Sequence, residues 1–406
     1  MKNRFLLLIT IGVVLFQGVF AEQLDTSGYL QNYTGVLFEN GDYSILQNSF
    51  NLNLDYSGDK GKLHFNPILY NYNSDSNIDL KLKEGYLDLY FDDFDLRIGK
   101  QQIIFGKADG AFITDVVSPK DLTEFILPDF DEIRIGVNAV KLDYYLGDMT
   151  LETIFIPGFQ GDILPSSNSI WAIKKPEQFA TAKMDMSKYE VKNRLENSSF
   201  AFKISSINDF IDYELVGGYL WDSMAVNNVS KSITGIVLQP EYHRNKILGG
   251  SFSKSLGGVI LRGEGAVNFD KTLQTEDIIK GGILDKNILN YMVGVDYNIF
   301  GVNFSNQIIQ NYILDYKDDE KIVQDELKTT LTLNINDKFL RDNLFCQMFA
   351  YYDVNNKGAL IKLKADYSLF DGFNATVGSN IFIGDSGEFG QFDKNDMIFT
   401  KLRYSF

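Results

Sequence analysis

The sequence predicts an all-β protein: a single antiparallel transmembrane β-barrel of about 18 strands, with sixteen as the alternative count and a helix-containing loop folded toward the lumen. Three observations predict this fold. The chain begins with an apolar segment of the export-signal type, most of the remaining sequence alternates apolar and polar residues with a period of two, and many alternating segments reach about ten residues. Soluble strands usually have about five or six residues, whereas a tilted strand needs about 9–11 to cross a bilayer.

Residues 1–21 read as a signal peptide. Two basic residues near the start are followed by an apolar run over 5–16, and the small residue Ala21 stands at the expected cleavage position. This order of regions is typical of a cleaved secretory signal. The alternative is a transmembrane anchor, but the apolar run is shorter than the ~20 residues such a helix needs. We therefore expect residues 22–406 to form an exported barrel in the outer membrane.

The composition argues against several functional classes. The chain has 38 Lys+Arg and 54 Asp+Glu, a net charge of −16, whereas a nucleic-acid-binding protein needs a basic face. The single cysteine, Cys346, excludes an internal disulfide framework and Cys-based metal sites. His64 and His243 lie near no Ser/Asp pattern of the nucleophilic type. We expect no catalytic site, no cofactor and no metal site, and an outer-membrane enzyme is the weakest alternative.

The segment 289–297 illustrates the alternation. Its odd positions are apolar, and the positions between them, such as Asn290 and Asp296, are mostly polar or small. Successive side chains of a strand point to opposite faces of the sheet. One set is therefore expected to meet lipid and the other a polar lumen. The same pattern occurs in the segments 46–56, 300–312, 327–335, 359–369 and 398–406.

Short connections alternate with long ones along the chain, which is the pattern of outer-membrane barrels with short periplasmic turns and long external loops. Eight tight turns predict about 18 strands with both chain ends in the periplasm. The segment 232–256 is difficult to divide into strands, and Pro67 requires a bulge or a rim position. We expect the tight turns at 57–61, 92–93, 147–148, 208–209, 256–258, 298–301, 336–342 and 371–372, and longer connections at 106–132, 159–193, 270–287, 315–323 and 385–394.

The last strand carries a candidate assembly signal. Leu402, Tyr404 and the terminal Phe406 alternate with Lys401 and Arg403. An aromatic last residue on an alternating strand resembles the signal that the bacterial outer-membrane assembly machinery reads. We expect Tyr404 and Phe406 to form this signal, and the alternative is an ordinary edge strand.

The polar faces of the strands carry charges of both signs. These charges form either cross-strand pairs in a water-filled channel or a ladder that selects solutes, and the sequence does not separate the two interpretations. The charges expected to face the lumen are Arg97, Arg134, Arg262, Glu264, Asp296, Lys362, Lys364 and Arg403, together with Lys203, Asp212, Glu214, Lys328, Asp366 and Lys401.

The segment 106–132 has two lysines, seven acids and a net charge of −5. Ser118 followed by Pro119 predicts a helix start, with a short helix continuing to about Phe125. Because this segment also has an apolar side, we expect it to fold into the barrel mouth and narrow it; the alternative is an external surface loop. The residues of this hypothetical pore constriction are Lys107, Asp109, Asp115, Asp121, Glu124, Asp129, Asp131 and Glu132.

The sequence Leu96-Arg97-Ile98-Gly99-Lys100-Gln101, then Phe105-Gly106, then Ser118-Pro119-Lys120-Asp121-Leu122 resembles a pattern of porin-like outer-membrane proteins of Gram-negative bacteria, a largely uncharacterised porin-type family. In that pattern an Arg/Gly strand leads to an aromatic-Gly pair and an Asn-Pro-x-Asp-Leu loop. This chain has Phe105 where Trp is common and Ser118 where Asn is common, and the resemblance covers about residues 95–160.

The resemblance implies a passive or substrate-selective channel and names no solute. We expect weakly selective diffusion of small hydrophilic solutes; the alternative is a structural or adhesive barrel that acts through its surface loops. The expected partners are outer-membrane lipid, the barrel assembly machinery and small hydrophilic solutes. Nucleic acid is not an expected partner, and a homo-oligomer is left open.

Overall fold

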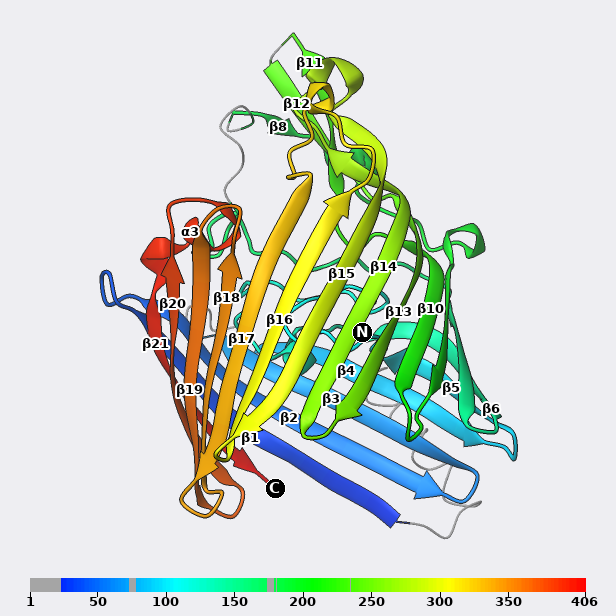
Figure 1. Cartoon of the computed structure of the whole chain (residues 1–406), viewed down its shortest axis with the longest axis vertical. Helices are drawn as coiled ribbons and strands as arrows, with labels where there is room; N and C mark the ends of the chain where they lie inside the picture. Colours follow the sequence, from blue (N-terminus) through cyan, green and yellow to red (C-terminus); the bar gives the residue numbers. More distant parts are fainter. Residues whose placement is uncertain (1–22, 73–77, 174–178, 180, 234) are drawn as a thin grey trace.

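The computed structural model describes residues 23–72, 78–173, 179, 181–233 and 235–406. In this part of the chain, 18 strands form one antiparallel sheet that closes on itself, because β1 (Gln23–Leu37) pairs with both β2 (Tyr43–Gly58) and β21 (Met397–Ser405) (Figure 1). The predicted barrel of about 18 strands is confirmed, and the alternative count of sixteen is wrong. The expected signal peptide lies outside the described residues.

Each barrel strand pairs with its neighbours along the chain. Besides β1, β2 and β21, the barrel strands are β3 (Gly61–Tyr72), β4 (Ile78–Tyr90), β5 (Phe94–Gln101), β6 (Val137–Leu146), β7 (Met149–Ile156), β9 (Ser199–Ser206), β10 (Asp212–Trp221), β13 (Arg244–Leu256), β14 (Val259–Gln274), β15 (Ile283–Ile299), β16 (Val302–Ile313), β17 (Leu327–Phe339), β18 (Leu344–Asp353), β19 (Gly358–Phe370) and β20 (Phe373–Ile383).

The remaining elements are short and lie in the connections. A second sheet contains β8 (Lys183–Met184), β11 (Val226–Ser232) and β12 (Gly235–Glu241), and Figure 1 places it above the long-loop end of β14 to β17. None of the helices in the described part of the chain is long and apolar enough to cross a membrane. The helices are α2 (Phe130–Ile133) and α3 (Gly387–Gly390), and the 3-10 helices are η2 (Met186–Lys188), η3 (Leu195–Asn197), η4 (Ile278–Lys280), η5 (Asp318–Glu320) and η6 (Asp393–Asn395).

The two ends of the barrel differ as expected. All eight tight turns fall at or next to the predicted positions, at one end of the barrel, and the long connections gather at the other (Figure 1). Gly257 and Gly258 both have positive φ, at 58° and 98°, as a two-residue hairpin turn requires. The ambiguous segment 232–256 contains β12 and β13, so it contributes one barrel strand and one strand of the small sheet. Pro67 lies at a bulge between β3 and β4, which resolves the conflict at this proline.

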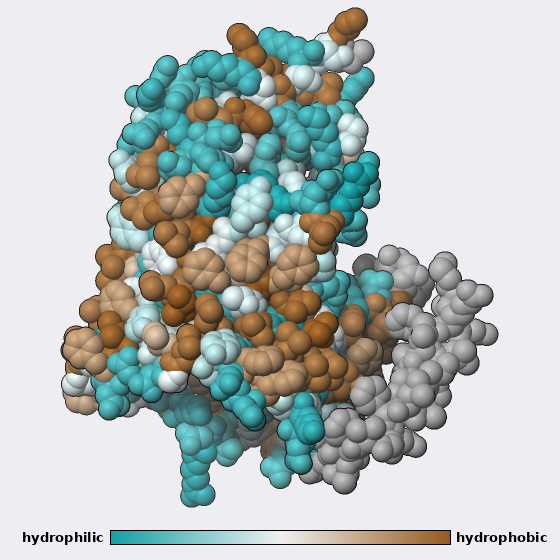
Figure 2. All heavy atoms as spheres, turned by 90° about the vertical axis from the view of Figure 1, so that its right-hand side faces the viewer, coloured by the Kyte–Doolittle hydropathy of each residue, from teal (hydrophilic) through white to brown (hydrophobic). Residues whose placement is uncertain are grey.

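The two faces of the barrel wall are chemically distinct. Val293, Ile308 and Leu331 lie side by side on β15, β16 and β17 and are exposed on the outer surface. The neighbouring Met292 and Gln307 point inward and are buried. Figure 2 shows hydrophobic side chains gathered in a belt over the lower half of the visible face, with hydrophilic ones above it and along its bottom edge. An apolar band of this kind matches a barrel wall in contact with lipid.

Candidate functional site

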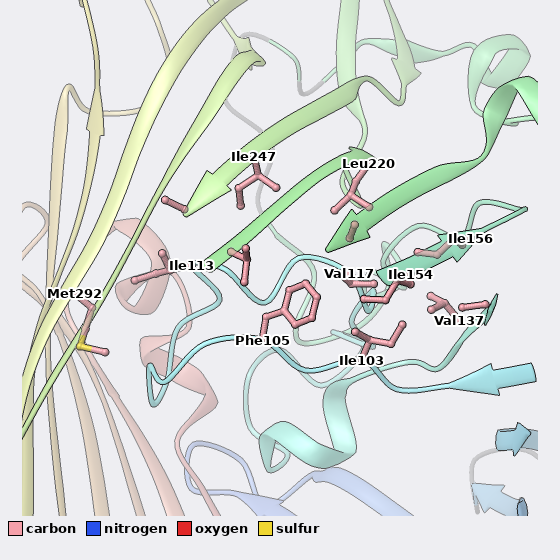
Figure 3. Packing of buried hydrophobic residues seen from close by; sticks show 14 of the residues in the cluster. Ile103, Phe105, Ile113, Val117, Val137, Ile154, Ile156, Leu220, Ile247 and Met292 are labelled. Carbon is pink, nitrogen blue, oxygen red and sulfur yellow. The ribbon is translucent and has the colours of Figure 1, made fainter. Parts of the chain in front are cut away.

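The connection 102–136 between β5 and β6, called here the inner loop, enters the barrel. Its residues hydrogen-bond to side chains of β10, β14 and β16. Figure 3 shows its apolar residues Ile103, Phe105, Ile113 and Val117 among side chains of the surrounding strands. The loop therefore occupies the lumen, which confirms the predicted loop folded toward the lumen.

The first half of the inner loop is fixed by a set of hydrogen bonds that we call the anchor. The carboxylate of Glu264 on β14 accepts from the backbone N–H groups of Lys107, Ala108 and Thr114, at 2.6–2.8 Å, and from the Thr114 hydroxyl at 2.7 Å. Glu264 is only 5% exposed. One buried carboxylate thus satisfies four donors, and hydrogen bonds to a charged acceptor are about twice as strong as neutral ones.

Two further charged residues complete the anchor. Glu214 on β10 accepts from the backbone N–H of Gly106 at 3.0 Å. Arg262 on β14 donates to the carbonyl of Lys107 and to the carboxylate of Asp109, both at 2.7 Å, and it also pairs with Asp296. The anchor therefore joins the loop to two strands through both backbone and side-chain groups.

The Phe105-Gly106 pair has a structural explanation. Gly106 has a φ of 84°, and a Cβ at this position would overlap with Glu264 Oε1 and Thr114 Oγ1. Phe105 is 4% exposed and lies in an apolar cluster with strand residues such as Ile247 and Met292. The glycine lets the backbone reach the carboxylate, and the aromatic ring covers the apolar wall beside it.

The inward side of this wall is apolar. Ala139, Ile154, Val216 and Ala266 point inward from β6, β7, β10 and β14, and all are buried beneath the inner loop in the same cluster. The sequence-based expectation of a polar inner face therefore does not hold for this part of the barrel. A water-filled lumen would expose these residues, so covering them is a driving force for the position of the loop.

The predicted helix from Pro119 to about Phe125 is absent, and the helix of the loop is α2 instead. Ser118 does not cap a helix, because its hydroxyl accepts from the Ile103 N–H and donates to the Ile103 carbonyl. Lys120 and Asp121 form isolated bridges with Arg134 and Ile163. These bridges require extended backbone, and the local helix signal is overridden by pairing with distant segments.

Asp115, predicted at the constriction, and Arg134, predicted to face the lumen, instead stabilise the interior of the loop. Asp115 is buried and accepts from Arg134 Nε at 2.7 Å. The ammonium group of Lys120 donates to the Asp115 carbonyl at 2.9 Å, and burial lowers the pKa of this lysine. Asp131 contacts Arg134 at 3.3 Å but is 90% exposed in its side chain. Asp115 and Arg134 therefore hold the loop together, whereas Asp131 faces solvent.

The middle of the inner loop packs into an aromatic cluster near the long-loop end. Phe125 contacts the rings of Phe382, Phe389 and Phe392, with ring centroids 4.9–6.3 Å apart. Trp171, from the connection after β7, contacts Phe382 and Phe392 in the same cluster. Segments far apart in the sequence thus meet above this side of the lumen.

The end of the inner loop faces a basic wall. Asp129 lies 3.4 Å from Lys364 on β19, and Glu132 lies 3.2 Å from Arg403 and 3.6 Å from Lys401 on β21. These acids, together with Asp131 between them, are called here the acidic segment. Burial raises the pKa of Asp129, but the positive charges of Lys364, Lys401 and Lys362 outweigh it and lower the pKa overall.

A cavity of about 440 Å³ lies between the acidic segment and the wall formed by β17 to β21 and β1. Its lining reaches the tight-turn end of the barrel at Asp342 and Ser368. Lys362 also lines it and donates to the Ile126 carbonyl at 3.1 Å. Further lining residues are Phe345, Phe349 and Tyr351 of β18, which the sequence-based list missed because both faces of that strand are rich in apolar residues.

A smaller cavity of about 80 Å³ lies on the other side of the acidic segment. Glu124 lines it together with Tyr33, Tyr72 and Lys401. Burial raises the pKa of Glu124 to about 7; Lys401 opposes this shift, and Glu132 and Asp121 add to it. This carboxyl group is therefore poised to change its charge near neutral pH.

The sequence-predicted residues thus fall into separate places. Asp109, Asp129, Glu132, Lys362, Lys364 and Arg403 line the larger cavity, and Asp121 and Glu124 line the smaller one. Lys107, Arg262, Glu264 and Asp296 belong to the anchor or to its ion pairs. Arg97 lies apart on β5, where it pairs with Asp88 and stacks on Tyr86.

The C-terminal residue completes the seam of the barrel. Phe406 exchanges two backbone hydrogen bonds with Gly28 of β1, at 3.0 and 3.1 Å, and its ring stacks on Phe50 of β2. Tyr404 pairs with Leu30 and, like Phe406, is exposed on the outer surface. Both aromatic residues are therefore accessible at the seam.

Comparison with known proteins identifies the family and supports the fold. Residues 73–392 match the family described as "Protein of unknown function (DUF1302)", so the chain belongs to this family. No curated protein matches the sequence. The prediction of a largely uncharacterised, porin-type family is confirmed.

Several solved outer-membrane channels share the fold. OccK2 (OpdF) of Pseudomonas aeruginosa, solved in complex with glucuronate, is 11% identical over 95% of this chain and 98% of its own, with a TM-score of 0.57. OccAB1 of Acinetobacter baumannii is 8% identical over 96% of this chain and 98% of its own, with a TM-score of 0.56. OccK5 (OpdH) of P. aeruginosa is 12% identical over 95% and 97%, with a TM-score of 0.54. The chain is therefore an 18-stranded barrel with the outer-membrane porin fold.

Proposed function

We propose that this member of the DUF1302 family is an outer-membrane channel for the diffusion of small hydrophilic solutes, without chemistry of its own. The observation that carries the proposal is the cavity of about 440 Å³ that remains beside the inner loop inside a closed barrel. Amide, hydroxyl and charged side chains line it beside aromatic rings, and it reaches the tight-turn end. A polar path of this kind inside an apolar outer wall suits passage of solutes that cannot cross lipid.

The inner loop is the proposed constriction. It is fixed to β10 and β14 at the anchor and meets β19 and β21 through the acidic segment, so it crosses the lumen from one wall to the other. Among the eight residues expected at the constriction, Asp109, Glu124, Asp129, Asp131 and Glu132 are the ones we assign to the aqueous path. The others serve the anchor or the loop interior, apart from Asp121, which lies 3.5 Å from Lys81 of β4.

The solute class follows from charge of both signs on the cavity wall, which suits polar rather than apolar solutes. OccK2, a channel of the same fold, was solved with glucuronate, a small hydrophilic solute. That observation supports transport of small polar molecules here without naming one.

Export and assembly belong to the same proposal. Residues 1–21 act as a cleaved signal peptide, and the mature chain is inserted by the barrel assembly machinery. Tyr404 and Phe406, accessible at the seam, are the proposed assembly signal.

The proposal is tested with the purified, folded protein in a planar bilayer. Stepwise conductance increments are expected, together with swelling of liposomes in small sugars. Heat-unfolded protein is the control. A folded barrel that adds no conductance and no solute permeability would contradict the channel function, and would favour a structural or adhesive role for the sheet of β8, β11 and β12 at the long-loop end.

A further inference from the structure

The basic wall of the larger cavity holds two carboxylates of the protein itself. Lys364 on β19 contacts Asp129, and Lys401 and Arg403 on β21 share Glu132, at 3.2–3.6 Å. All five side chains line the cavity. Three cationic side chains from two strands therefore face the same cavity, and each of them is paired with a carboxylate of the inner loop.

These ion pairs are solvated and exchangeable. Asp129 is 61% exposed in its side chain, and Glu132 and Arg403 are 33% and 34% exposed. Exposed ion pairs contribute little to stability, because water and salt compete for both partners. A solute that carries the same anionic groups can therefore compete with Asp129 and Glu132 without disturbing the buried anchor.

The spacing of Asp129 and Glu132 indicates which kind of solute would compete best with them for the basic wall. Asp129 stands at the N-cap of α2 and Glu132 lies three residues later. Asp129 has an extended backbone and Glu132 is the third helical residue, and the side chains at these two positions both belong to the first turn of a helix. The loop thus presents two carboxylates one turn apart, which is the arrangement of a short-chain dicarboxylate.

We propose that this cavity binds a short-chain dicarboxylate, whose two carboxylates take the places of Asp129 and Glu132 on Lys364, Lys401 and Arg403. This proposal rests on the channel function and names the solute class that the channel prefers. The loop acids act as a built-in competitor, so a monocarboxylate, which replaces only one of them, binds more weakly.

The wall also limits the charge of the solute. Asp366 lies 3.8 Å from Lys364 and offsets part of its charge, so the wall favours two carboxylates over a polyanion. The cavity of about 440 Å³ is large enough for a molecule of four to six carbon atoms.

The test is calorimetric titration of succinate, acetate and inorganic phosphate into the detergent-folded barrel at low salt. Succinate is expected to bind at least about tenfold more tightly than acetate and more tightly than phosphate. Tighter binding of phosphate, or equal binding of succinate and acetate, would overturn the dicarboxylate assignment.

Two double variants separate a binding role from a structural one. The Lys364→Gln, Arg403→Gln variant should weaken succinate binding about tenfold. The Asp129→Asn, Glu132→Gln variant should strengthen it by a similar factor, because the competitor is gone. Lys246→Gln is the matched control, since Lys246 pairs with Asp270 on exposed side chains away from the cavity. If both double variants left succinate binding unchanged, or both weakened it, the basic residues would serve only to hold the loop.

Bilayer recordings separate this proposal from the channel function. A barrel that binds succinate as predicted but conducts no ions would contradict the channel and leave the binding site standing. A barrel that conducts but neither binds succinate nor shows a reduced current in its presence would contradict the site and leave the channel standing. Heat-modifiable mobility on gels confirms that each variant is folded.

Discussion

The inner loop meets the barrel wall by two different kinds of contact. At the anchor, buried Glu264 accepts four hydrogen bonds, three of them from backbone N–H groups. At the acidic segment, Asp129 and Glu132 meet Lys364, Lys401 and Arg403 through ion pairs in which both partners are partly exposed. A buried carboxylate that loses its donors is left unsatisfied, whereas an exposed one is taken up by water. The comparison indicates that the anchor sets the position of the loop, and that the acidic segment sets the charge of the larger cavity, the proposed aqueous path.

The largest expected effect is at the anchor. Glu264→Gln places an amide N–H₂ against backbone N–H donors and should lower the free energy of unfolding by about 3 kcal/mol. Glu214→Gln keeps an acceptor for the Gly106 N–H but removes the charge that Lys107 contacts at 3.6 Å, and should cost about 1 kcal/mol. Denaturant titration in lipid vesicles measures both. Equal effects of the two variants would mean that the anchor is not centred on Glu264.

A second change tests the close approach of the backbone to Glu264. Gly106→Ala adds a Cβ that overlaps with the Glu264 carboxylate and imposes a φ of 84° on alanine. We expect a loss of about 2 kcal/mol in the free energy of unfolding, from strain and the displaced carboxylate. Gly41→Ala is the control: its φ is 76°, and no atom lies within 4 Å of the added Cβ, so it reports the backbone strain alone, about 1 kcal/mol. Equal losses of unfolding free energy in the two variants would show that the Glu264 carboxylate moves away from the added Cβ at no cost.

The assembly signal is tested by truncation. Removal of Phe406 deletes two backbone hydrogen bonds at the seam and the stacked ring on Phe50. The amount of folded barrel in membranes should fall severalfold, as measured by heat-modifiable mobility. Undiminished folded protein would reduce Phe406 to an ordinary strand end.

The acidic segment should behave in the opposite way to the anchor. The Asp129→Asn, Glu132→Gln variant should change the free energy of unfolding by less than about 1 kcal/mol, since exposed ion pairs contribute little. Its reversal potential in a salt gradient should shift toward anion preference, most clearly at low salt, where the screening length is about 30 Å. A large loss of stability with an unchanged reversal potential would erase the distinction between the two regions.

The smallest expected effect is a change of ion preference with pH. Burial raises the pKa of Glu124 to about 7, and the groups around it are Lys401, Glu132, Asp121, Tyr33 and Tyr72. Glu124 is neutral below this pH and negative above it, so cation preference should increase slightly as the pH rises from 6 to 8. Reversal potentials of wild type and Glu124→Gln measure the effect, and the variant should lose it. An identical pH dependence in both would place the titrating group elsewhere.

The alternation of the strands was enough to predict the barrel. A period of two assigns each residue to the lipid-facing or the inward-facing side without any knowledge of which strands are neighbours. The eight tight turns also carry local signals, such as Gly257-Gly258. The local signal was misleading in the inner loop. Ser118-Pro119 predicted a helix, but the residues that follow form isolated bridges with Arg134 and Ile163 instead. The paired partners are distant in sequence, so no local signal could reveal them.

The charged residues show the same division. The sequence by itself predicted a barrel of about 18 strands with sixteen as the alternative, an acidic loop after β5, and charges of both signs on the inward faces of the strands. Only the tertiary structure decided that Glu264 binds backbone N–H groups while Lys364 and Arg403 line the larger cavity. The physical reason is that the pleat of a strand fixes only which face a side chain occupies. Whether that side chain is buried under the loop or open to water depends on where the loop crosses the lumen, and burial of the apolar patch on one wall favours that path.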